Sequence, residues 1–210
     1  MKSLRHNLLL PAIVACLALA APASAATSSS WKRTTVAHAN KDSVQSTPVC
    51  EHADDRPGPA SSDASERAHA EATVCLLNKQ RESRGRHKLR LNARLSTAAR
   101  RHTIDMVRRN YFSHTSRSGA SVVDRLTRSG YMRGARRWTV GENLAWGSGS
   151  RSTPRQIVAA WMRSPGHRSN ILQRRFREIG IGVVFALPSG ASSTARRAAA
   201  TYTTTFGARN

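Results

Sequence analysis

The chain has 210 residues, including 34 lysines and arginines and 12 aspartates and glutamates, so its formal net charge is +22. This length fits one domain with flanking segments rather than several domains. It also allows a hydrophobic core large enough to fold without depending on disulfides or bound metal ions. Such an excess of positive charge creates a field that attracts polyanions.

The N-terminus has the pattern of a secretory signal peptide. Residues 1–5 carry positive charge, residues 8–21 are apolar, and residues 23–25 (Ala-Ser-Ala) form an A-x-A cleavage sequence. Pro11 interrupts the apolar run, which is too short for a membrane span. We therefore expect residues 1–25 to be removed and the protein to be secreted without a transmembrane segment. Because an exported protein first meets anionic wall polymers and lipid head groups, we expect these rather than nucleic acid to be the partners of the positive charge.

The three cysteines have two different interpretations. Residues 13–16 (Ile-Val-Ala-Cys) resemble a lipoprotein cleavage box, so lipidation at Cys16 stays open as an alternative to cleavage after Ala25. Cys50 and Cys75 are the pair that remains. In an exported chain such a pair predicts a disulfide, with two free thiols as the alternative.

Composition divides the mature chain into a linker and a basic domain. Residues 26–68 are rich in Ser, Thr, Ala, Pro and Asp and have almost no large apolar side chains, which predicts a disordered linker. Residues 71–210 carry 27 basic and six acidic residues. We therefore expect the folded domain to begin near His69.

Four helices are predicted from apolar periodicity and capping residues. They cover residues 70–84, a stretch that follows Asn92 and ends at Asn110, residues 122–128 and residues 154–162. In the second, the buried face is expected to consist of Leu95, Ala98, Ala99, His102 and Met106. Pro154 occupies the first helical position, where proline is tolerated.

Strand-like runs follow the first three helices. Residues 138–146, 179–185 and 201–206 are rich in β-prone residues, and the last two flank a polar loop over 188–200, as expected for a hairpin with a long tip. Helices followed by a small antiparallel sheet indicate an α+β fold.

Three short segments contain the residues best suited to chemistry: Tyr111–His114, Gly141–Ala145 and Ser164–Leu172. His114 and His167 lie in predicted loops, and Glu142 is one of only six acids in the basic domain. Two histidines and a glutamate can hold Zn²⁺ or act as general acid and base. No short metal-ligand spacing supports either role, and each histidine taken alone is more often a structural, hydrogen-bonded group.

The three segments in this order, together with Trp161 and residues 202–207, resemble a bacterial domain of the CAP superfamily (SCP/PR-1-like, cysteine-rich secretory proteins). The resemblance covers residues 71–208, so we place the domain at 69–210. It implies an α-β-α sandwich, with a small antiparallel sheet between helical layers. It also implies an open cleft in which His114, Glu142 and His167 are the functional, potentially catalytic residues, with His114 and His167 as ligands of Zn²⁺ or another divalent metal.

The sequence departs from the family pattern at the second glutamate of the cleft. Trp161 is followed by Met162-Arg163-Ser164, with no acid. Glu178 is the nearby candidate, but its place before a predicted strand favours a structural role, as in a buried pair with an arginine. Trp146 and Trp161 are interpreted as packing residues.

The resemblance and the charge together favour a secreted, monomeric binding module. We expect it to be attached to anionic wall polymer or lipid surfaces, with a small lipid-like molecule as a possible ligand of the cleft. The alternative is a metal-assisted or acid–base hydrolase, resembling a protease, that uses the same residues. A cationic toxin is the third hypothesis, but the sequence shows no basic amphipathic helix with a bulky apolar face to support it.

Overall fold

The computed structural model describes residues 49–58, 62–188 and 198–210, all within one unit that spans Ser46–Asn210. The expected signal peptide, including Cys16, and residues 26–48 of the expected linker lie outside the described residues. The rest of the expected linker, residues 49–58 and 62–68, is described: Cys50 and Ala53 are buried in the core, and the first helix already begins at Asp63.

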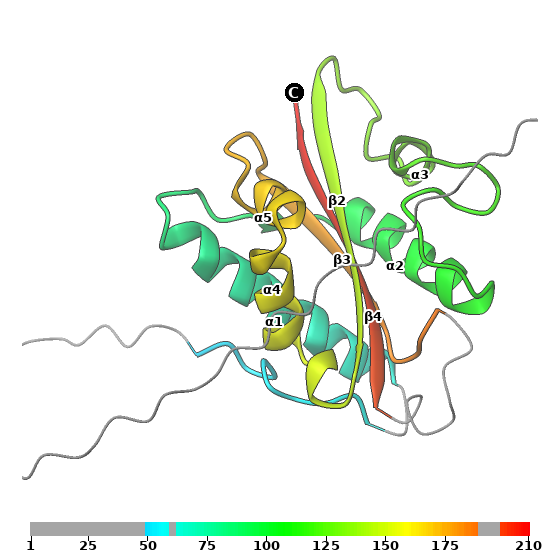
Figure 1. Ribbon diagram of the computed structural model, residues 1–210. Helices are drawn as coiled ribbons and strands as arrows, with labels where there is room; N and C mark the ends of the chain where they lie inside the picture. The colour runs from blue at the N-terminus through cyan, green and yellow to red at the C-terminus, as the bar shows by residue number, and fades with distance from the viewer. Residues whose placement is uncertain (1–48, 59–61, 189–197) are drawn as a thin grey trace, which may run out of the picture. The chain divides into compact units, whose positions relative to one another are not determined.

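The described helices follow the predicted order with one addition (Figure 1). They are α1 (Asp63–Glu82), α2 (Ala93–Arg108), α3 (Val122–Arg128), α4 (Pro154–Arg163) and α5 (Pro165–Leu172), with a 3₁₀ turn at Gly149–Ser152. Asn92 caps α2 by accepting hydrogen bonds from Arg94 N and Leu95 N, as predicted. The helix α5 is the addition, and it contains His167, so the prediction that this histidine lies in a loop is wrong. Proline has no N–H to lose at the first helical position, so Pro165 begins this helix.

The described strands form a mixed four-stranded sheet in the order β1-β3-β4-β2. Its strands are β1 (Arg90–Leu91), β2 (Trp138–Ser148), β3 (Glu178–Val184) and β4 (Ala199–Arg209). The long strands β3 and β4 pair antiparallel and form the predicted hairpin, and β2 pairs antiparallel with β4 as an edge strand. The two-residue β1 pairs with β3 in parallel, so the sheet is mixed rather than wholly antiparallel.

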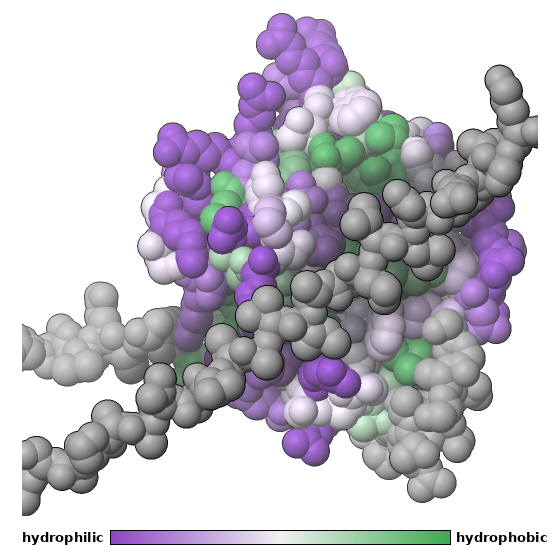
Figure 2. Space-filling view, in the orientation of Figure 1, coloured by the Kyte–Doolittle hydropathy of each residue, from purple (hydrophilic) through white to green (hydrophobic). Residues whose placement is uncertain are grey.

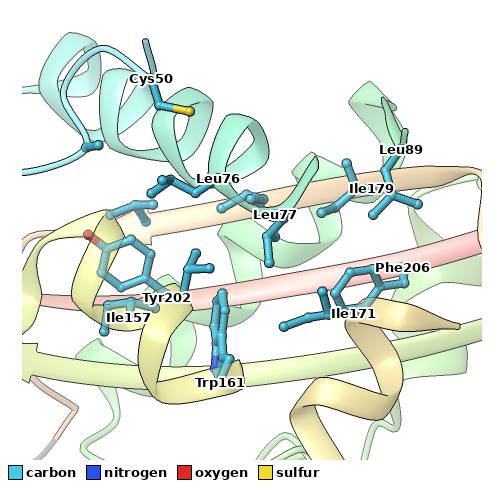
Figure 3. Packing of buried hydrophobic residues seen from close by; sticks show 14 of the residues in the cluster. Cys50, Leu76, Leu77, Leu89, Ile157, Trp161, Ile171, Ile179, Tyr202 and Phe206 are labelled. Carbon is cyan, nitrogen blue, oxygen red and sulfur yellow. The ribbon is translucent and has the colours of Figure 1, made fainter. Parts of the chain in front are cut away.

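Helices cover both faces of the sheet, which confirms the predicted α-β-α sandwich (Figure 1). One face packs against α1, α4 and α5, and the other against α2 and α3. Figure 3 shows side chains of α1, α4 and α5 converging on Tyr202 and Phe206 of β4, with Trp161 inserted between helix and sheet. On the other face, all five predicted apolar-face residues of α2 are buried, including His102.

The cysteine pair is oxidised, as predicted. Cys50 and Cys75 form a disulfide that closes a sequence separation of 25 residues and joins the segment before α1 to α1 itself. A second contact reinforces this attachment, because the imidazole of His69 on α1 hydrogen-bonds to the carbonyl of Asp55.

A buried arginine fixes the end of α5. The Arg81 side chain is fully buried, and its guanidinium donates to the carbonyl oxygens of His87, Ile171, Gln173 and Phe176 at 2.6–3.3 Å. Burial lowers the pKa of Arg81 to about 10, which still leaves it charged at neutral pH. These bonds satisfy carbonyls at and beyond the C-terminus of α5, the helix that carries His167.

Candidate functional site

Glu142 lies in the middle of the edge strand β2 and is almost completely inaccessible, with 2% of its side chain exposed. It stands opposite Thr205 of β4, whose hydroxyl bonds to the backbone of α2, so both residues are on the α2–α3 face of the sheet. A carboxylate at such a depth requires charged or hydrogen-bonding partners, because desolvation of an isolated charge is costly.

Arg125 of α3 is the principal partner of Glu142. Its Nη2 donates to both carboxylate oxygens, at 3.0 Å to Oε1 and 2.8 Å to Oε2. Its Nη1 donates to Ser116 Oγ and to the carbonyl of Ala120, so the guanidinium is held from two sides. Nothing in the sequence distinguishes Arg125 from the many other arginines, and only the tertiary packing identifies it as the partner of Glu142.

His114 is the second partner of this carboxylate. Its Nδ1 lies 2.9 Å from Glu142 Oε1, while 59% of its side chain is exposed. Because a carboxylate bound to an arginine accepts hydrogen bonds, Nδ1 carries the hydrogen and Nε2 of the neutral ring has a free lone pair. Glu142 therefore orients the imidazole of His114.

A pair of asparagines connects β2 to α5 and places His167. Asn143, which is fully buried, donates to the carbonyl of His167 at 3.1 Å. Asn170 donates to the carbonyl of Glu142 at 3.1 Å and to Asn143 Oδ1 at 2.9 Å. The predicted segments Gly141–Ala145 and Ser164–Leu172 are thus joined by hydrogen bonds at the edge of the sheet.

The histidines His114 and His167 are electrostatically coupled. Burial lowers the pKa of His167, and His114 lowers it further whenever its own ring is protonated. The structure thus brings the three predicted residues to one region. Glu142 contacts His114, and His167 is near enough to His114 for their charges to interact. A lowered pKa keeps His167 neutral at pH 7, which is the form that binds metals.

Of the three predicted site residues, only the two histidines are suited to bind a metal ion. In the described part of the chain, no group of three or more His, Cys, Asp or Glu side chains is placed to hold a metal ion. Both oxygens of Glu142 accept from Arg125, so this carboxylate supports His114 rather than offering a third ligand. Two neutral imidazoles remain, with every other coordination position left to water or a ligand.

Glu178 and Trp161 have the structural roles predicted for them, although the partners of Glu178 differ, and Trp146 departs from its predicted packing role. Glu178 bonds to Asn92 and Tyr131 rather than to an arginine, and these two bonds occupy both of its carboxylate oxygens. Trp161 is buried and donates to the carbonyl of Leu144, as expected for packing, whereas Trp146 is half exposed. Phe112 is also exposed, so the loop before His114 is anchored by Tyr111, whose hydroxyl donates to Asp105.

His102, which is buried behind this site, makes stability depend on pH. Burial lowers its pKa, and the charge of Arg125 adds to the effect. The unfolded chain therefore binds this proton at a higher pH than the folded chain. Acidification from pH 7 to 5 should lower the free energy of unfolding, by at most about 1.4 kcal/mol per pH unit for each such proton.

Urea unfolding of the His102→Gln variant at pH 7, 6 and 5 checks this expectation. We expect a weaker dependence on pH than in the wild type, whereas His87→Gln, at an exposed position, should keep the wild-type dependence. Parallel pH profiles of the His102 variant and the wild type would contradict the assignment. Part of the dependence should persist, because burial also lowers the pKa of His69.

The fold and the arrangement of these segments define a member of the Cysteine-rich secretory protein family (CAP), whose sequence profile matches residues 74–191. The chain belongs to this family. Among curated proteins it is 38% identical over 117 residues to YkwD, an uncharacterized protein of Bacillus subtilis, covering 56% of this chain and 43% of that protein. It is 32% identical over 108 residues to YlbC, an uncharacterized membrane protein of the same organism, covering 51% and 29%.

Solved structures show the same fold. An extracellular protein of Bacillus anthracis that contains an SCP domain has 27% identity and a TM-score of 0.55, covering 71% of this chain and 44% of that one. An outer surface protein of Borrelia burgdorferi has 19% identity and a TM-score of 0.52, covering 65% and 90%, a similarity of fold. The chain thus spans less than half the length of both curated relatives and of the Bacillus anthracis protein. Within residues 49–58, 62–188 and 198–210, no helix has the length and apolarity to cross a membrane.

Proposed function

We propose that this protein is a secreted binding module that holds Zn²⁺ or another divalent metal between His114 and His167. The observation that carries the proposal is the Arg125–Glu142–His114 chain of contacts, which fixes the His114 ring and leaves its Nε2 free. Carboxylate-oriented imidazoles of this kind are the usual ligands of zinc, since the carboxylate sets the tautomer and raises ligand basicity.

The number of protein ligands determines what such a site can do. A metal held by two imidazoles has coordination positions left for water and for an oxygen-bearing ligand, so it can anchor a ligand at this site. Bound zinc would supply Lewis acidity to that ligand. Glu142 orients His114, and the hydrogen bonds of Asn143 and Asn170 hold the helix that carries His167.

Binding is better supported than hydrolysis. A general base must have an oxygen or nitrogen within reach of the attacking water. Glu142 has only 2% of its side chain exposed and is paired with Arg125, and Glu178 accepts hydrogen bonds from Asn92 and Tyr131. His114 and His167 are then the groups at this site that could act as general bases, and they are the same groups that would hold the metal.

A strongly basic end of the sheet supports attachment to anionic wall polymer or lipid. Two shallow depressions lie where β2 begins and β4 ends, and Figure 2 shows this end as hydrophilic. Exposed Trp138 lies there, with arginines from four segments: Arg90, Arg133, Arg137, Arg175, Arg177 and Arg209. Electrostatic attachment of this kind weakens as salt rises. The extracellular and outer surface proteins that share the fold support secretion.

Calorimetric titration with Zn²⁺ tests the metal site. We expect wild-type binding with a Kd on the order of micromolar, and at least a tenfold loss in His167→Ala, since one of two ligands is removed. His87→Ala, which removes an exposed histidine elsewhere, should bind as the wild type does. Equal affinity of the His167 variant and the wild type, or no binding by the wild type, would contradict the proposal.

A further inference from the structure

A pocket of about 300 Å³ lies between α2 and α3, and His114 is not among the residues that line it. Its wall is dominated by arginines and serines: Arg101, Arg109, Arg125, Arg128, Ser116 and Ser118. Arg101 lies on α2 and Arg109 caps the C-terminus of that helix, while Arg125 and Arg128 are three residues apart on α3. Basic side chains from both helices therefore line the same pocket.

The charge in this pocket is unbalanced. Among the described residues of its wall, Asp105 is the one carboxylate, and it is already paired with Arg109 at 3.0 Å and accepts from the Tyr111 hydroxyl. Arg101 and Arg128 have no ion-pair or hydrogen-bond partner in the ranges that the structure describes. Guanidinium groups facing each other across a cavity repel, and a bound anion relieves that repulsion.

Arg125 is a lining residue of this pocket whose side chain is held in place by the protein. This side chain is 8% exposed, and its Nη1 and Nη2 are occupied by Ser116, Ala120 and Glu142. Its Nε–H has no partner among the described residues, and it is the donor left for a ligand. Unlike the flexible, exposed Arg101 and Arg128, this group is held in place before any ligand arrives.

We propose that this pocket binds a phosphate group. Several arginines and serine hydroxyls that converge from two helices and a loop match a tetrahedral oxyanion, since guanidinium pairs with phosphate through two parallel hydrogen bonds. The volume exceeds what a bare phosphate ion needs and leaves room for a small polyol attached to it. The inference goes beyond the proposed function and does not depend on a metal between the two histidines.

Calorimetry with inorganic phosphate and with glycerol phosphate, at constant ionic strength set with sodium chloride, tests the pocket. We expect the full chain to bind at least one of these anions with a Kd below about 1 mM, and the double variant Arg101→Gln/Arg128→Gln to bind at least tenfold more weakly, because two guanidinium partners of the phosphate are lost. The matched control is Arg151→Gln/Arg163→Gln, which removes two exposed charges at the 3₁₀ turn and at the end of α4, away from both the pocket and the basic end of the sheet. This control should bind within about twofold of the wild type, since screening weakens distant charges.

The outcomes separate the specific pocket from a general effect of charge. Equal loss in both double variants, or no binding by the wild type, would overturn the proposal. Tighter binding of glycerol phosphate assigns the pocket to an organic phosphate, as in a wall polymer or lipid head group, and equal binding assigns it to free phosphate. Zinc titration of the Arg101/Arg128 variant tests the histidine site independently, because neither arginine contacts His114 or Glu142. Failure of one proposal is therefore distinguishable from failure of the other.

Discussion

Replacement of Gly180 by alanine is expected to lower the free energy of unfolding by at least about 3 kcal/mol, through overpacking between β3 and α2. A Cβ at Gly180 would lie 2.1 Å from the carbonyl carbon of Leu95 and 2.1 Å from the nitrogen of Ser96. Both are backbone atoms of α2, so no side-chain rotation can relieve the clash. The helix would have to move away from the sheet, and the buried side chains of that face would lose contacts.

Urea unfolding of Gly180→Ala beside Gly166→Ala measures this effect. A Cβ at Gly166, in the first turn of α5, meets no atom within 4 Å and has no positive φ to oppose it. The control should therefore be neutral or slightly stabilising, by up to about 1 kcal/mol, as expected for Gly→Ala at an unstrained helical position. Equal midpoints for the two variants would show that α2 does not rest on the backbone of β3.

Replacement of Arg125 by methionine is expected to cost about 3–5 kcal/mol of stability, because it leaves the carboxylate of Glu142 buried without its counter-ion. The double variant Arg125→Met/Glu142→Gln should recover a large part of this loss, since it removes the unpaired charge as well. Recovery is expected to be incomplete, because Ser116, Ala120 and His114 also lose partners.

A double-mutant cycle in urea, with Arg125→Met, Glu142→Gln and the combination, gives the coupling directly. Arg128→Met supplies the matched control: it removes an arginine from the same helix at an exposed position, and should change stability by less than about 0.5 kcal/mol. Additive losses in the cycle would mean that the two side chains do not depend on one another. Such a result would also remove the support for the orientation of His114.

The expected signal peptide and most of the expected linker fall outside the described residues, so those assignments stay predictions. The start of the domain could not be read from composition. Residues 49–58 have little apolar character, yet the Cys50–Cys75 disulfide and the His69–Asp55 contact attach them to α1. Arg155 adds a backbone hydrogen bond to Ala53 and an ion pair with Asp54. A covalent link and these contacts outweigh the low hydrophobicity of so short a segment, and periodicity does not reveal them.

The sequence by itself determined the elements whose causes are local. The Asn92 cap, the apolar face of α2 and the β-prone runs at 138–146, 179–185 and 201–206 each depend on neighbouring residues, and the structure contains all of them. The motif order likewise identified the family, whereas the functional roles of His114, Glu142 and His167 stay predictions.

The tertiary structure alone decided which charges are paired. Nothing near Arg125 in the sequence distinguishes it from the other arginines, and only the packing of α3 against β2 places its guanidinium 2.8 Å from Glu142. The same holds for Arg81, Glu178 and the pocket between α2 and α3. A side chain's partners at long range depend on burial and on contacts between elements far apart in the chain, whereas caps and periodicity act within a few residues.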